Sequence, residues 1–170
     1  AEITELSRRG MRAVFFCDDN FIGRPGYTKE LLRALGPLNN SFERPMRFLT
    51  QLTINLACDE EMMELMADAN FDEVCVGLES PREASLREAN KPQNYRTNMI
   101  QDIQKIQSYG ILVRGNLIVG FDSDDEFIFD EIFDFVKEAG VLNPLINILK
   151  APNGTPTQAR FERDGRLVDI

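Results

Sequence analysis

The sequence predicts an α/β fold in which a parallel β-sheet alternates with helices. Five short apolar segments each end in polar residues, and each is followed by a segment whose apolar residues have helical spacing. A strand and helix together take about 30 residues, the length of a βαβ unit, and no hairpin-sized turn joins two strands. The 170 residues are expected to form one domain, residues 1–170. Such a chain forms either part of a closed eight-stranded barrel, which needs about 250 residues, or an open doubly wound sheet.

The five expected strands are continuous apolar runs, which indicates burial on both faces of the sheet. The first lies within the stretch Arg12–Gly23, where a run of Val and Phe changes abruptly into two carboxylates and an amide. The other four are expected at Met46–Leu52, Phe71–Glu79, Ile111–Phe121 and Leu142–Leu149.

Helices are expected where apolar residues recur every three or four positions between capping or breaking residues. Ser80 is expected to cap a short helix, with Pro81 at its first position. The Met and Leu stripe that follows Asp59 is expected to pack in the core. The other expected helices are Ile3–Arg9, Tyr27–Leu35 closed by Gly36-Pro37, Asp59–Met66, Tyr95–Tyr109, Asp124–Lys137 and Thr157–Arg163.

Charge and composition exclude several kinds of function. The net charge is −9, from 19 basic and 28 acidic residues, and the scattered basic residues argue against nucleic acid or an anionic membrane as the main partner. No apolar run approaches the roughly 18 residues of a membrane span, and the acidic N-terminus is unlike a signal peptide, so a cytoplasmic location is expected. Histidine is absent, which excludes Ser-His and Cys-His nucleophiles. Cys17, Cys58 and Cys75 suit neither a disulfide framework nor a zinc site and are interpreted as buried or half-buried side chains.

Polar residues gather where the expected strands end, the edge at which parallel-sheet proteins bind ligands. Two adjacent carboxylates, Asp18 and Asp19, repel each other unless a cation or hydrogen-bond donors lie nearby. Asp122 is equally well explained as a helix N-cap, and Gly120 either lets a flat ligand ring approach the strand or marks a bulge. The candidate site residues are Asp18, Asp19, Asn20, Thr50, Gln51, Glu79, Ser80, Asp122, Lys150 and Asn153.

Four segments in a fixed order resemble a known family. Phe15–Phe21, Val76–Ser80, Leu117–Asp122 and Gly154–Pro156 are similar to the core of radical S-adenosylmethionine (SAM) enzymes, and most similar to the branch that carries a cobalamin-binding domain. The resemblance covers nearly the whole chain, from the family's second barrel strand to its sixth. It implies a partial TIM-type barrel in which a 4Fe-4S cluster cleaves SAM to a 5'-deoxyadenosyl radical. The implied chemistry is that of an oxidoreductase or methyltransferase acting on a small-molecule substrate.

The resemblance also assigns cofactor-binding residues. The segment Asp18–Asn20 falls where the family has a Gly-Gly-Glu segment that receives the methionine amino group. Glu79–Ser80 falls where ribose hydroxyls or the methionine moiety bind. Asn116, Ile118 and Gly120 fall on the family's G-x-I-x-G adenine strand, and Asn116 departs from its first glycine.

The cysteines are the largest departure from the family. The family's C-x-x-x-C-x-x-C triplet is missing, and a site-differentiated cluster requires three thiolates on one loop. We therefore expect a truncated core that begins in the helix after this loop and that alone binds no cluster and cleaves no SAM. The missing cluster loop, and a cobalamin-binding domain, are then expected partners. A lost first strand also leaves a sheet edge that invites self-association.

Two other hypotheses remain open. A divalent-metal barrel lyase or hydrolase would use Asp18, Asp19, Glu79 and Asp122, because carboxylate oxygens suit Mg or Mn. A non-catalytic scaffold would dock a partner through the acidic segment Asp122–Glu131.

Overall fold

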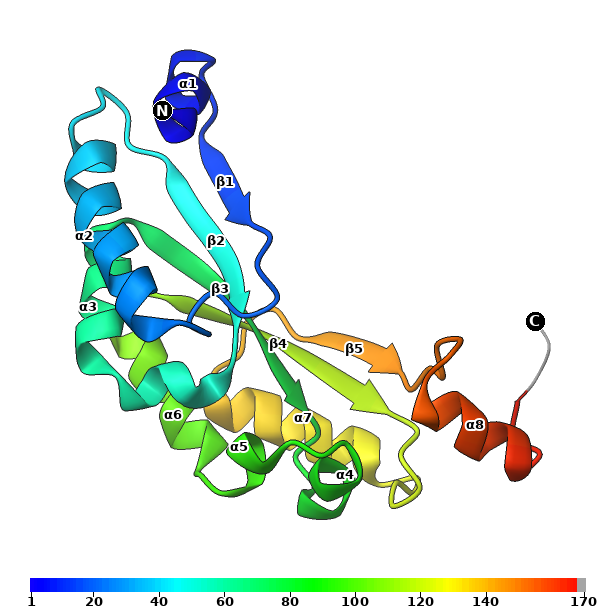
Figure 1. Cartoon of the computed structure of the whole chain (residues 1–170). Coiled ribbons are helices and arrows are strands. Elements are labelled where there is room, and N and C mark those ends of the chain that lie inside the picture. The colour runs from blue at the N-terminus through cyan, green and yellow to red at the C-terminus, as the bar shows by residue number, and fades with distance from the viewer. Residues whose placement is uncertain (168–170) are drawn as a thin grey trace.

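The computed structural model describes residues 1–167 and is built around one sheet of five parallel strands. Neighbouring strands pair in the order β1-β2-β3-β4-β5, and the sheet curls into half of a barrel with helices along its convex side (Figure 1). The strands are β1 Ala13–Phe16, β2 Arg47–Leu52, β3 Phe71–Glu79, β4 Leu112–Val119 and β5 Leu145–Ile148. The predicted α/β class and partial TIM-type barrel are confirmed.

Helices connect successive strands, as crossovers between parallel neighbours require. Figure 1 shows α2, α3, α6 and α7 along the convex side, and α4 and α5 near the carboxyl ends of the strands. Within residues 1–167, no helix is both long and apolar enough to cross a membrane. The helices are α1 Glu2–Arg8, α2 Pro25–Asn40, the 3-10 turn η1 Ile54–Cys58, α3 Glu60–Asp68, α4 Glu83–Glu88, α5 Pro92–Tyr95, α6 Met99–Ser108, α7 Ile128–Ala139 and α8 Pro156–Arg163.

The hydrophobic core lies between the convex face of the sheet and the helices. Four phenylalanine rings from β1, β2, β3 and the loop after β1 pack with centroids 5.1 to 5.5 Å apart. The methionines of α3 are completely or almost completely buried, so the expected core role of this stripe is confirmed. The four rings belong to Phe16, Phe21, Phe48 and Phe71.

The first strand is not buried on both faces, contrary to expectation. Phe15 is 44% exposed, and all four residues of β5 are exposed. Both strands lie at sheet edges, and no element of the described chain covers the concave side. The apolar runs therefore predicted these two strands correctly, but the prediction that they are buried on both faces was wrong.

The helix expected at Tyr27–Leu35 continues through Gly36-Pro37 to Asn40. The buried Asn39 holds the extra turn, because its amide donates to the carbonyls of Met46 and Ala69 at 2.8 and 3.2 Å and accepts from the amide of Met46 at 2.9 Å. Tertiary hydrogen bonds thus offset the break that Gly-Pro normally causes.

Three other helix boundaries differ from the predictions. Ser80 does not cap a helix; its hydroxyl accepts from the amide of Arg82, and α4 begins at Glu83. The expected helix Tyr95–Tyr109 begins only at Met99, where Asn98 caps α6, and Tyr95 is the last residue of the separate short helix α5. Helix α7 begins four residues later than Asp124 because the Asp124 carboxylate binds the end of β4.

Candidate functional site

Two adjoining cavities lie at the carboxyl ends of the central strands. The larger, of about 450 Å³, has apolar walls from the ends of β4 and β5 and polar walls from Glu79, Glu88 and Arg160. The smaller, of about 200 Å³, lies on the concave face between β2, β3 and β4 and includes Asp19 and Cys75. Lys91 lines both cavities. Polar and apolar groups therefore converge at the edge where parallel sheets bind ligands.

Glu79 is placed at the cavities by an irregularity at the end of β3. The pairing between β3 and β4 shifts between Gly77 and Glu79, and Glu79 has a backbone φ of +64°. Such bulges redirect side chains, and a positive φ is costly for a residue other than glycine. The Glu79 side chain is 11% exposed, and its Oε1 lies 2.8 Å from Nζ of Lys91.

The end of β4 is held by a carboxylate. One oxygen of Asp124 accepts hydrogen bonds from the amides of Gly120 and Phe121 at 2.8 and 3.0 Å, and the other accepts from the hydroxyl of Ser85 at 2.9 Å. Gly120 has a φ of +104°, a conformation that side chains rarely adopt. The turn that leaves β4 therefore has a fixed shape next to the larger cavity.

Helix α8 closes one side of the larger cavity and is attached by an ion cluster. Arg160 donates to Glu88 at 2.7 Å and to Asp122 at 3.0 Å, and Arg166 also donates to Asp122. The hydrogen bond from Arg166, together with the charges of both arginines, lowers the pKa of Asp122. The chain after β5 is thus tied to the β3–α4 and β4–α7 segments.

A second ion cluster surrounds Arg82 and uses the acids of the segment Asp122–Glu131. Arg82 donates to Asp125 and Glu131 at 2.6 Å and to the Ser123 carbonyl at 2.8 Å. These bonds raise the pKa of Arg82 and lower those of both carboxyl groups. Several acids that the scaffold hypothesis would offer to a partner are therefore engaged within the chain.

Comparison with protein families identifies this arrangement. The family model described as "Radical SAM superfamily" matches residues 1–147. The chain belongs to the radical SAM superfamily. It is 35% identical to an uncharacterised methyltransferase from Synechocystis sp. over 158 residues, 93% of this chain and 30% of that protein. It is 34% identical to the hopanoid C-2 methylase of Rhodopseudomonas palustris over 170 residues, 98% of this chain and 32% of that protein.

Solved structures share the fold of this chain. The radical SAM methyltransferase TsrM from Kitasatospora setae, solved with cobalamin and a [4Fe-4S] cluster, superposes with a TM-score of 0.78 at 18% identity over 96% of this chain and 32% of that chain. Streptococcus suis SuiB superposes with a TM-score of 0.62 at 14% identity over 89% of this chain and 33% of that one. The radical SAM chain described here spans about a third of the length of the relatives it matches.

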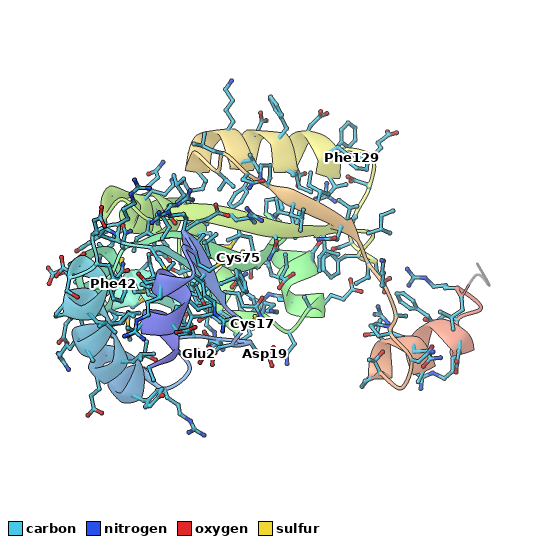
Figure 2. All side chains as sticks on the ribbon, turned by 90° about the horizontal axis from the view of Figure 1, so that it is seen from above. Glu2, Cys17, Asp19, Phe42, Cys75 and Phe129 are labelled. Carbon is cyan, nitrogen blue, oxygen red and sulfur yellow. The ribbon has the colours of Figure 1, made fainter. Side chains whose placement is uncertain are left out.

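The structure brings some of the predicted radical SAM site residues together. Glu79 and Ile118 line the larger cavity, and Asn116 and Asp19 line the smaller one with Gln51. Asp19 and Cys75, both labelled in Figure 2, come from the loop after β1 and from β3. Gly120 lies between the cavity residues Ile118 and Phe121, but its amide is bonded to Asp124.

Other predicted site residues lie elsewhere. Asn20 lines a separate cavity next to η1 and α3, and Ser80 is buried within its own turn. Thr50 is buried on the convex face, where its hydroxyl donates to the Phe16 carbonyl at 3.1 Å. Asp18, Lys150 and Asn153 are exposed and line neither cavity.

The described residues do not fit an iron–sulfur cluster. Cys17 and Cys58 are exposed, which contradicts their interpretation as buried or half-buried, and Cys75 is half-buried. Across residues 1–167, no three Cys, Asp or Glu side chains are grouped so that they could hold a metal ion. Within the same residues the four acids of the divalent-metal hypothesis form no such group, and two of them have other partners, because Glu79 pairs with Lys91 and Asp122 with two arginines.

Several residues that line the larger cavity were not predicted from the sequence. Lys91, Glu88 and Arg160 line the larger cavity, but they lie outside the strand ends that the pattern singled out. The Asn90-Lys91-Pro92 turn was the one local signal near Lys91. Arg160 had no such signal, because its partner Glu88 is 72 residues away in the chain.

Proposed function

We propose that this chain forms the SAM-binding region of a radical SAM methyltransferase. The observation that carries the proposal is the larger cavity, whose volume of about 450 Å³ suits a nucleoside-sized ligand. It combines apolar walls with the carboxylate-bearing side chain of Glu79. Methyl transfer is supported by the names of the relatives, a methyltransferase and a hopanoid methylase.

The cavity walls suit the parts of SAM. Ile118, Phe121 and Leu149 provide an apolar slot for the flat adenine ring. Glu79 provides an acceptor for the ribose hydroxyls. Across Lys91, the smaller cavity offers the carboxylate of Asp19 and the amide of Gln51 to the ammonium group of the methionine moiety.

The proposal includes parts that residues 1–167 do not provide. Ligands for a 4Fe-4S cluster, a cobalamin-binding domain and the substrate contacts would come from other parts of the protein; TsrM, with the same fold, was solved with both cofactors. A cytosolic location belongs to the same proposal, because the cysteines of the described chain are unpaired, as thiols are in a reducing compartment.

Equilibrium binding of radiolabelled SAM to the purified protein tests the proposal. We expect saturable binding, and we expect Ile118→Asp to weaken it more than about tenfold, because the change places a charge in the adenine slot. The matched control is Ile146→Asp on β5, because Ile146 is already 51% exposed and lines neither cavity. It should bind SAM as the unchanged protein does.

The proposal would be wrong if the unchanged protein showed no saturable SAM binding. It would also be wrong if Ile146→Asp and Ile118→Asp weakened binding equally, because the slot would then have no special role.

A further inference from the structure

We propose that Lys91 is a positioning residue that fixes the direction of the Glu79 carboxylate between the two cavities. The inference rests on the proposed function and adds a residue to it. Lys91 Nζ lies 2.8 Å from Glu79 Oε1, and Lys91 lines both cavities. Lys91 would therefore act on the ligand through Glu79.

The Glu79 side chain needs such a partner. A glutamate has several rotamers, and a site that binds hydroxyls requires one of them. Glu79 Oε1 pairs with Lys91, whereas Oε2 has no protein partner within residues 1–167. The pair is partly shielded from water, with side-chain exposures of 11% and 36%, so its attraction is screened less than on an open surface. Lys91 can thus hold one oxygen while the other accepts from a ligand.

Gly77 provides the space in which this pair forms. A Cβ atom on Gly77 would lie 2.8 Å from Glu79 Oε1 and 3.8 Å from Lys91 Nζ. The first contact is closer than a Cβ atom tolerates, but it involves the end of a flexible side chain. Alanine at this position would therefore displace the carboxylate and leave the strand in place.

The segment that carries Lys91 is itself anchored to the bulge in β3. The amide of Asn94, which is 1% exposed, donates to the carbonyls of Gly77 and Leu78 at 2.9 Å each. The backbone amide of Asn94 donates to the carbonyl of Lys91 at 3.0 Å. Lys91 thus reaches Glu79 from a fixed support, as a positioning residue must.

The test is a double-mutant cycle measured as the Kd for SAM in the purified protein. We expect Lys91→Met and Gly77→Ala each to weaken binding about tenfold, and Lys91→Arg to restore it to within about threefold. On a Glu79→Gln background, Lys91→Met should cause no further loss, because its effect passes through the carboxylate. The matched control is Lys105→Met, which breaks a Lys–Glu pair of 2.9 Å with Glu60 on the outer surface.

The outcomes separate the two proposals. Absence of SAM binding in the unchanged protein overturns the proposed function and this inference with it. Normal binding by the unchanged protein together with unchanged binding by Lys91→Met overturns this inference alone. The inference is also overturned if the fold-losses in SAM affinity caused by Lys91→Met and by Glu79→Gln multiply in the double variant. Lys91 would then contact the ligand directly. A fall in thermal stability confined to Lys91→Met, without rescue of binding by Lys91→Arg, would show a structural role and overturn it as well.

Discussion

The convex and concave faces of the sheet use alternate residues of the same strands but differ in what covers them. On the convex face, Phe48 of β2 is fully buried beneath the helices. On the concave face, Phe15 of β1 and Leu112 of β4 are 44% and 48% exposed, and polar residues of the central strands line a cavity. Packing that stabilises the fold is therefore concentrated on the convex face, and the concave face stays open.

The largest expected effect tests this division with two identical substitutions. Phe48→Ala should lower the free energy of unfolding by about 3–5 kcal/mol, because it opens a cavity in the cluster of four rings. Phe15→Ala removes the same side chain from the exposed face and should cost less than about 1 kcal/mol. Urea denaturation monitored by circular dichroism measures both. Equal losses would mean that the concave face also contributes to the core.

The difference between the two faces also explains which parts of the fold were predictable from the sequence. The runs at Phe71–Glu79 and in the other strands identified all five strands, because each strand holds enough apolar residues to stand out from the polar loops around it. The same runs could not show which face is covered, since β1 and β5 are apolar yet exposed. The extension of α2 past Gly36-Pro37 was equally hidden, because it depends on the contact of Asn39 with the distant Ala69.

The candidate site was predictable only in part, for the same physical reason. Glu79, Ile118 and Asp19 lie at strand ends, and parallel strands bring such ends to one edge. Thr50 also lies near a strand end, but the alternation of side chains turns it to the convex face. Lys91 and Arg160 come from segments whose positions depend on tertiary contacts, which a local pattern does not contain.

A smaller effect is expected on the attachment of helix α8, which lies at the carboxyl-end edge of the sheet. Arg160→Met removes the donor that joins Glu88 and Asp122, and should raise amide hydrogen exchange in α8 about two- to fivefold. Arg163→Met is the matched control, since Arg163 is an exposed arginine of α8 that lines neither cavity. Exchange that is unchanged in Arg160→Met would show that the cluster does not hold α8.

Acid should weaken the same attachment. The pKa of Asp122 is lowered from its usual 3.8, first by the hydrogen bond from Arg166 and then by the charges of both arginines. Because the pKa is lower in the folded state, the pairing stabilises α8 above pH 3.8 and is lost as the pH falls through the lowered value. Amide chemical shifts of α8, followed by NMR from pH 7 to pH 3, should therefore change at the acid end. A change centred above pH 5 would contradict this assignment.

The smallest expected effect is on the alkylation rates of the thiols, which should differ between exposed cysteines and the half-buried Cys75 on the concave face. Burial raises the pKa of the Cys75 thiol and outweighs the opposing charge of Arg114. The thiolate is the reactive form, so a raised pKa and limited access both slow alkylation. With iodoacetamide at pH 8, Cys17 and Cys58 should react several-fold faster than Cys75, as read by peptide mass spectrometry. In urea the three rates should converge.

A faster reaction of Cys75 than of Cys17 and Cys58 in the folded protein would contradict this prediction. It would mean that Cys75 lies in an open, electropositive part of the concave face and is not shielded within the smaller cavity.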